Sequence, residues 1–145
     1  MKIKLGIIGY GGMGKWHAEN APRAGVEIAA VCDIDEVKQK EAVDAGFKMY
    51  QTAEELLKDP EVNTVILTVP NYLHKEMCVK AAKAGKNVIT EKPAALNVQE
   101  LDEMEAACKE AGVFFTSQSN RRWDKDNADR KKSIWTKECL AISLP

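Results

Sequence analysis

The sequence predicts an α/β fold in which helices cover a doubly wound parallel sheet of six strands. Three observations support this expectation. A glycine-rich segment directly follows the first apolar run of the chain, within residues 3–14. Helix-compatible stretches end four times in Ala-Gly just before a short strand-like run, at residues 24–25, 45–46, 84–85 and 111–112. The segment 62–69 has an apolar centre, Val65-Ile-Leu, which is typical of a strand buried on both faces.

The Ala-Gly pairs and the helix starts set the order of the elements. A glycine just past a helix adopts the left-handed conformation that closes it, so each pair marks a helix end. Helices that alternate with short strands are typical of a parallel sheet. Two capping-box patterns, Thr52 with Glu55 and Asn97 with Glu100, mark helix starts. We expect strands at residues 3–8, 26–32, 47–50, 63–68, 87–90 and 113–118, and helices at residues 13–24, 35–45, 53–58, 72–84 and 97–111.

The glycine-rich segment is a G-x-G-x-x-G made by Gly9, Gly11 and Gly14. It lies between the first expected strand and the first expected helix. In such a segment the first glycine allows a tight turn, and the second lets a phosphate approach the backbone. The third lets the helix pack closely on the strand. Because a helix N-terminus offers N–H groups and a partial positive charge, the segment predicts a site for a dinucleotide pyrophosphate.

An acidic residue follows at the distance that such a site requires. Asp33 ends the second expected strand, nineteen residues after Gly14. A carboxylate there accepts hydrogen bonds from the adenosine ribose hydroxyls and repels a 2′-phosphate, which favours NAD over NADP. The alternative is that Asp33 or Asp35 only caps the next helix, and we assign the cap to Asp35. S-adenosylmethionine enzymes also combine a glycine turn with an acidic strand end, but the third glycine argues against that class.

Two further polar segments follow expected strands. Thr68-Val-Pro-Asn71 and then His74 follow the fourth strand, and Glu91 and Lys92 follow the fifth. Ligands of open α/β sheets bind at the carboxyl ends of the strands, so we expect these segments near the glycine turn. A lysine at such a strand end orients a substrate hydroxyl or takes part in proton transfer.

Together these segments resemble a known family. The chain contains, in this order, a G-x-G-G-x-G start with His17, Val-Cys-Asp33, Val-Pro-Asn-x-x-His74, Glu-Lys92-Pro and Asn120-Arg-Arg. This order resembles the glucose–fructose oxidoreductase / inositol dehydrogenase / MocA family over residues 1 to about 126. The resemblance implies a Rossmann domain that binds NAD(P), followed by a larger, mostly antiparallel α/β domain that binds substrate and builds the oligomer.

The resemblance also implies roles for individual residues. Lys92 would be the catalytic residue, which binds the substrate hydroxyl and assists its proton transfer; a solvated lysine is the alternative. For His74 a packing role competes with cofactor contact, and His17 is expected to pack or bond locally. Arg121 and Arg122 are expected near the cofactor or as surface charge. The expected cofactor-binding residues are Gly9, Gly11, Gly12, Met13, Gly14, Asp33, Thr68, Pro70, Asn71, His74 and Glu91.

The composition argues against several other classes. The 145 residues carry a formal net charge of −1, which gives no general attraction to nucleic acid or to an anionic membrane. No apolar run has the length of a membrane span, and the apolar start is too short for a signal peptide. The cysteines lack metal-ligand spacing and are expected to be reduced thiols of a cytoplasmic protein without a metal site. They are Cys32, Cys78, Cys108 and Cys139.

The resemblance ends near residue 126. Residues 127–145 are expected to form an irregular tail that does not match the family, and we expect the second, substrate-binding domain to be absent. The codons of residues 134–145, read two bases later, can spell Leu-Asp-x-Gly-Met-Leu-Gly-Asn-Ile-Phe. This sequence resembles the family's connection into the second domain. We therefore expect that a frameshift truncated a full-length oxidoreductase.

Two functions follow from these patterns. The first is the NAD(P)-binding domain of a dehydrogenase that moves hydride between nicotinamide and a sugar- or polyol-type hydroxyl carbon, with little or no turnover by the chain alone. The second is a non-catalytic NAD-binding or redox-sensing module, against which the intact Glu91-Lys92-Pro93 argues. Apolar surface left exposed by the absent domain makes a homo-oligomer the expected state.

Overall fold

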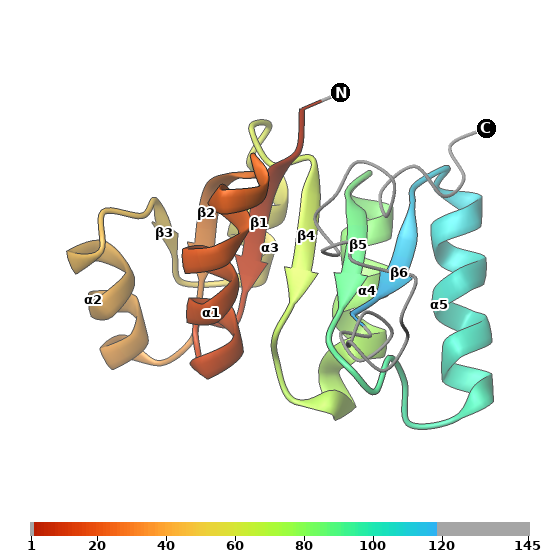
Figure 1. Cartoon of the computed structure of the whole chain (residues 1–145). Coiled ribbons are helices and arrows are strands. Elements are labelled where there is room, and N and C mark those ends of the chain that lie inside the picture. Colours follow the sequence, from red (N-terminus) through yellow and green to blue (C-terminus); the bar gives the residue numbers. More distant parts are fainter. Residues whose placement is uncertain (1, 119–145) are drawn as a thin grey trace, which may run out of the picture.

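The computed structural model describes residues 2–118, and it confirms the expected parallel sheet of six strands. The strands lie in the order β3-β2-β1-β4-β5-β6, and every neighbouring pair is parallel. They are β1 (Lys4–Ile8), β2 (Glu27–Cys32), β3 (Met49–Tyr50), β4 (Thr64–Leu67), β5 (Asn87–Thr90) and β6 (Phe115–Ser117). The order reverses between β1 and β4, and the strands end at the lower edge of the sheet in Figure 1.

Helices cover both faces of the sheet. They are α1 (Gly12–Asn20), α2 (Glu36–Asp44), α3 (Ala53–Lys58), α4 (His74–Lys83) and α5 (Val98–Glu110), with 3₁₀ turns η1 (Ala21–Ala24) and η2 (Asn71–Leu73). The helices α1 and α2 lie on one face, and α3, α4 and α5 lie on the other (Figure 1). This is the doubly wound arrangement that the sequence predicts.

Two helices differ from their expected bounds by more than one residue at an end. The helix predicted for residues 13–24 ends at Asn20 and continues as the 3₁₀ turn η1. Pro22 explains the change, because a proline has no N–H for the α-helical hydrogen bond. The helix predicted for residues 72–84 begins at His74, since the chain after Pro70 first forms the 3₁₀ turn η2.

The central strands supply two apolar cores. Leu5, Ile7 and Ile66 point to the side of α1 and α2, whereas Val65 and Leu67 point to the side of α3, α4 and α5. Successive side chains of a strand point to opposite faces, so a strand covered on both faces is apolar throughout. The sheet is therefore buried on both sides, and its exposed functional surface lies at the strand ends.

The predicted helix caps are present, one of the two capping boxes in full and the other in part. Thr52 and Glu55 form both hydrogen bonds of their capping box. Asn97 accepts from the Glu100 backbone N–H, but the Glu100 carboxylate accepts from the Leu96 N–H, so the second box is half formed. The four glycines of the Ala-Gly pairs all have positive φ, at Gly25, Gly46, Gly85 and Gly112.

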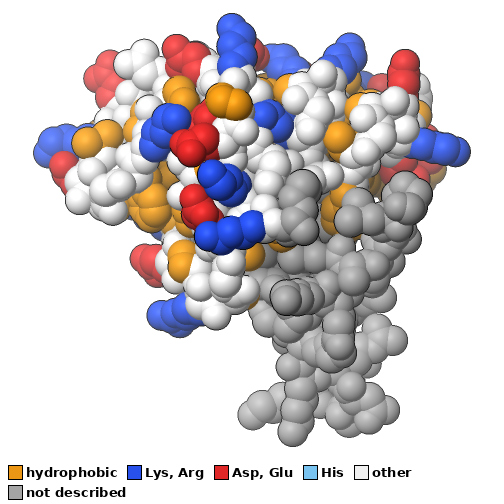
Figure 2. All heavy atoms as spheres, turned by 90° about the horizontal axis from the view of Figure 1, so that it is seen from above, with side chains coloured by type: hydrophobic (Ala, Val, Ile, Leu, Met, Phe, Trp, Pro, Cys, Tyr) orange, Lys and Arg blue, Asp and Glu red, His pale blue; other side chains and the backbone are white. Residues whose placement is uncertain are grey.

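The amino ends of the strands form an edge of paired charges. Figure 2 looks onto this edge and shows Lys and Arg side chains beside Asp and Glu side chains. Glu27 lies 2.8 Å from Lys2 and 4.0 Å from Lys4, and Lys4 also lies 3.4 Å from Glu61. This edge carries both signs of charge and does not form a basic surface over the described part of the chain.

Within residues 2–118 no helix is long and apolar enough to cross a membrane. The same residues contain no cluster of three or more His, Cys, Asp or Glu side chains that could hold a metal ion. The predicted irregular tail, the domain boundary at residue 126, Arg121, Arg122 and Cys139 all lie outside the described residues.

Candidate functional site

The turn between β1 and α1 requires glycine at two positions. Gly9 has a φ of +98°, and a Cβ on it would lie 2.8 Å from the Thr68 carbonyl oxygen. A Cβ on Gly14 would lie 2.0 Å from the Gly9 carbonyl oxygen. The Gly9 N–H donates to the Cys32 carbonyl at 2.9 Å. The turn is therefore packed tightly between the ends of β2 and β4 and the first turn of α1.

The middle of the same turn is open. A Cβ on Gly11 or Gly12 would meet no atom within 4 Å, and the neighbouring Met13 is 41% exposed. Gly11 is the N-cap of α1, no side chain caps the helix, and its first turn holds no acidic residue. Backbone N–H groups and the helix dipole attract an anion to such a terminus. The residues present therefore fit a dinucleotide pyrophosphate.

Asp33 is tied to the glycine turn. Its Oδ2 accepts from the Tyr10 backbone N–H at 2.6 Å, and its Oδ1 accepts from the Asp35 N–H at 2.9 Å. Asp35 in turn caps α2 by accepting from the Val37 N–H at 2.8 Å, which confirms the cap predicted for it. Each carboxylate oxygen keeps a further lone pair, so Asp33 is able to accept from a ribose hydroxyl as well.

The end of β2 is acidic. Asp33, Asp35 and Glu36 lie within four residues of each other in the chain. A 2′-phosphate placed at the ribose would meet this negative charge, and like charges repel. The same region includes the buried Cys32, whose thiol has a pKa raised to about 12 by burial. That thiol is therefore unsuited to nucleophilic chemistry at neutral pH.

The segment after β4 supports the turn from the other side. The Thr68 hydroxyl donates to the Gly9 carbonyl and lies 3.1 Å from the Ile8 carbonyl. Its hydroxyl therefore faces the backbone of the glycine turn. Pro70 and Asn71, which follow, are exposed at the carboxyl edge of the sheet.

His74 begins α4 and is buried, with 1% of its surface exposed. Its Nε2 lies 3.0 Å from the Val69 carbonyl oxygen, and its Nδ1 lies 3.0 Å from the Pro93 carbonyl oxygen. The ring thus lies between the segments that follow β4 and β5. Both ring nitrogens of His74 thus have backbone carbonyls as partners, and its contact with a cofactor stays a prediction.

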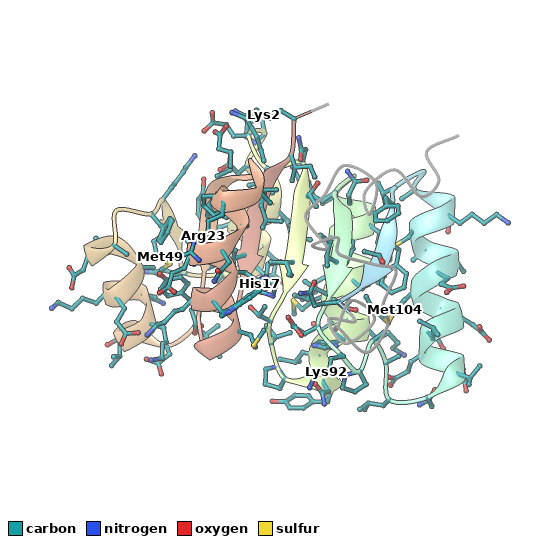
Figure 3. All side chains as sticks on the ribbon, in the orientation of Figure 1. Lys2, His17, Arg23, Met49, Lys92 and Met104 are labelled. Atoms are coloured by element: carbon teal, nitrogen blue, oxygen red, sulfur yellow. The ribbon has the colours of Figure 1, made fainter. Side chains whose placement is uncertain are left out.

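Glu91 and Lys92 end β5 in different surroundings. Glu91 is 8% exposed, and its Oε1 accepts from His17 Nε2 at 2.7 Å. Its Oε2 lies 3.4 Å from the Lys92 backbone N–H. Lys92 is exposed, and its peptide bond to Pro93 is cis. Figure 3 shows His17 on α1 and Lys92 beyond the carboxyl end of β5.

The His17 contact is the feature that the sequence did not predict. His17 is fully buried and packs edge-on against the Trp16 ring, but its hydrogen bond joins a residue 74 positions away. The packing expected for His17 is present, whereas its hydrogen-bond partner Glu91 is distant in the chain. The sequence does indicate that His17 is buried. Gly14, His17, Ala18 and Ala21 are spaced so that they fall on one helical face, and all four are buried.

These contacts join most of the predicted residues at one edge of the sheet. The glycine turn contacts Asp33 and Thr68 directly, and α1 contacts Glu91 through His17. The carboxyl edge next to the reversal between β1 and β4 is where ligands of open α/β sheets bind. An open backbone at a helix N-terminus, a carboxylate with free lone pairs and an exposed lysine are the groups present at this edge.

A family model and a relative of known function match most of this chain. The family model described as "Oxidoreductase family, NAD-binding Rossmann fold" matches residues 3–119. Myo-inositol 2-dehydrogenase of Thermotoga maritima is 33% identical over 138 residues, which cover 91% of this chain and 40% of that protein.

Solved structures agree. The NAD-binding protein from Listeria innocua matches with a TM-score of 0.84 and 38% identity, over 87% of this chain and 38% of that one. The WlbA dehydrogenase from Bordetella pertussis, solved with NADH and UDP-GlcNAcA, matches with a TM-score of 0.79 and 29% identity, over 84% of this chain and 38% of that one. The chain thus spans about two fifths of the length of these relatives. With the family model matching most of its residues, the chain belongs to the glucose–fructose oxidoreductase / inositol dehydrogenase / MocA family and represents its NAD-binding Rossmann domain.

Proposed function

We propose that residues 1–126 form the cofactor-binding domain of an NAD-dependent dehydrogenase that acts on a sugar- or polyol-type hydroxyl carbon. The observation that carries the proposal is the open backbone at Gly11 and Gly12, which lies at the N-terminus of α1 beside the anchored carboxylate of Asp33. Lys92 is exposed at the same edge of the sheet.

Each residue has a distinct task in this proposal. The backbone N–H groups at the start of α1 hold the pyrophosphate, and Asp33 accepts from the adenosine ribose. The nicotinamide supplies the hydride chemistry when it is bound. Lys92 donates a hydrogen bond to the substrate hydroxyl oxygen and takes part in moving its proton, which raises the rate only if the lysine is held in position.

The choice of NAD over NADP rests on charge. Asp33, Asp35 and Glu36 form an acidic end of β2, which opposes a 2′-phosphate. Lys38 lies on α2 close to these acidic residues, but its ammonium group is bound to Glu41 at 3.1 Å. We therefore propose NAD as the cofactor and NADP as the weaker ligand.

The substrate and the assembly belong to the same proposal. We assign substrate binding to a second domain, which corresponds to the length of the relatives that this chain does not span. We also propose assembly as a homo-oligomer, for which exposed apolar side chains such as Met13, Trp16 and Tyr72 are available. The three described cysteines are free thiols, which is typical of the reducing cytoplasm.

Isothermal titration of NAD into the 145-residue chain tests the proposal. We expect saturable binding at one site per chain, and weaker binding of NADP under the same conditions. Absorbance at 340 nm with NAD and a polyol such as myo-inositol should stay near background, because Lys92 alone does not make a substrate site. A folded chain that binds neither dinucleotide would contradict the assignment.

A further inference from the structure

Lys92 is exposed, but the residues on both sides of it are anchored. Glu91 accepts a 2.7 Å hydrogen bond from His17 of α1, and the Pro93 carbonyl lies 3.0 Å from His74 of α4. Two helices from opposite faces of the sheet therefore hold the segment that carries Lys92. Figure 3 labels His17 on α1 and Lys92 beyond the carboxyl end of β5.

The contact from α1 is the informative one, because α1 is also the helix of the cofactor site. Gly14 of this helix leaves no room for a side chain against Gly9. His17 follows one turn later on the same buried face. The position of His17 is therefore fixed relative to the glycine turn. Its hydrogen bond in turn holds Glu91 at a fixed place relative to that turn.

Glu91 connects to Lys92 through the backbone. One carboxylate oxygen is bound to His17, and the other lies 3.4 Å from the Lys92 N–H. The carboxylate is nine-tenths buried, with 11% of its side chain exposed. A carboxylate held in this way fixes the backbone of the residue that follows it.

We propose that His17 and Glu91 are a positioning pair, which sets the place of Lys92 relative to the glycine turn. The pair rests on the proposed function, because it matters for catalysis only if Lys92 works beside a bound dinucleotide. Glu91 is then a positioning residue, and His17 joins it although it lies on a helix that is distant from Lys92 in the chain. A hydrogen bond buried from water keeps its geometry better than an exposed one, which suits this task.

The chain offers matched variants. His17→Leu fills much of the same space without a donor, so it breaks the bond to Glu91 and keeps the packing of α1. His17→Gln carries a side-chain N–H near the place of Nε2 and should preserve the bond. Glu91→Ala removes the acceptor and serves as a second way to break the pair.

Acetylation of Lys92 by acetic anhydride, read by peptide mass, measures where its amine lies. Lys40 of α2, with 81% of its side chain exposed, serves as an internal reference lysine. In the unmodified chain, saturating NAD should slow the acetylation of Lys92 relative to Lys40. His17→Leu should still bind NAD at the glycine turn, but the Lys92-to-Lys40 ratio should return to its NAD-free value. His17→Gln should restore the protection.

The outcomes separate the two proposals. If NAD fails to bind the unmodified chain or to protect its Lys92, the proposed function is wrong, whatever the variants do. If His17→Leu binds NAD and still protects Lys92, the positioning pair is wrong while the function stands. If His17 had only a structural role, His17→Leu would have a lower melting temperature but the same protection of Lys92 by NAD. If circular dichroism shows that His17→Leu is unfolded, the same ratio in Glu91→Ala decides, measured at an NAD concentration that saturates this variant. Loss of protection then supports the pair, and retained protection contradicts it.

Discussion

Single residues of the glycine turn serve two different needs. Gly14 is required by the protein itself, since a Cβ there would lie 2.0 Å from the Gly9 carbonyl oxygen. Gly11 has a φ of −73°, which any residue adopts, and open space beside it. Its lack of a side chain therefore leaves room for the proposed pyrophosphate. Substitution of Gly14 should therefore reduce mainly the stability of the fold, whereas substitution of Gly11 should reduce mainly the binding of the cofactor.

We expect Gly14→Ala to lower the free energy of unfolding by about 1–3 kcal/mol, the usual range for forcing an extra methyl group into a packed site. Gly11→Val replaces the N-cap glycine by a poorer capping residue, which should cost no more than about 1 kcal/mol, and it should abolish measurable NAD binding. Urea unfolding and isothermal titration of both variants check this. A Gly11→Val chain that binds NAD as tightly as the unmodified chain would refute the assignment of the pyrophosphate site.

Asp33 also acts at the residue scale. It anchors the Tyr10 N–H and is expected to bind the ribose, so its charge serves both the turn and the ligand. Asp33→Asn keeps the size of the side chain and removes the charge. We expect NAD affinity to fall about tenfold to a hundredfold, which corresponds to the 1.5–3 kcal/mol of a hydrogen bond to a charged group. The ratio of the NADP dissociation constant to the NAD dissociation constant should fall. Titration with both dinucleotides measures this ratio, and an unchanged ratio would count against the ribose role.

At the scale of elements, Asp59 joins α3 to the segments before β3 and β5. Its buried carboxylate accepts from the Glu61 N–H at 2.9 Å and from the Tyr50 hydroxyl at 3.2 Å, and it lies 3.0 Å from the Lys48 ammonium. Its backbone carbonyl accepts from the buried Lys86 ammonium at 2.8 Å. The end of α3, strand β3 and the start of β5 therefore meet at this residue.

These contacts predict how stability depends on pH. Burial tends to raise the pKa of Asp59, but the Glu61 N–H and the Lys48 ammonium outweigh it and hold that pKa below its ordinary value. A carboxylate with a lowered folded pKa contributes stability above the unfolded pKa of about 3.9, and this contribution is lost as the pH falls through the folded pKa.

Asp59→Asn should therefore be less stable than the unmodified chain at pH 6, and the difference should shrink as the pH falls below about 4, where the unfolded aspartate begins to take up a proton. Urea unfolding at several pH values measures both chains. A stability difference that stays constant down to pH 3 would contradict this account of Asp59.

At the scale of the whole molecule, the sequence predicts what depends on local patterns. The glycine turn, the caps at Asp35 and Thr52, and the order of strands and helices all follow from neighbours in the chain. The partner of His17 does not, because Glu91 is 74 residues away and only the folded sheet brings the two together. The helix ends also differ where a proline intervenes, as at Pro22. Patterns therefore locate the site, while its internal contacts need the three-dimensional structure.

The proposed cofactor should stabilise the molecule as a whole, because its site joins the ends of β1, β2, β4 and β5 in a single sheet. A ligand that binds only the folded state at a hundred times its dissociation constant adds about 2.7 kcal/mol to the free energy of unfolding. For a folded unit of this size, that raises the melting temperature by roughly 10 °C. Differential scanning calorimetry should show this shift with NAD, a smaller one with NADP at the same concentration, and none for Gly11→Val with either. Equal shifts with the two dinucleotides would mean that the acidic end of β2 does not select the cofactor.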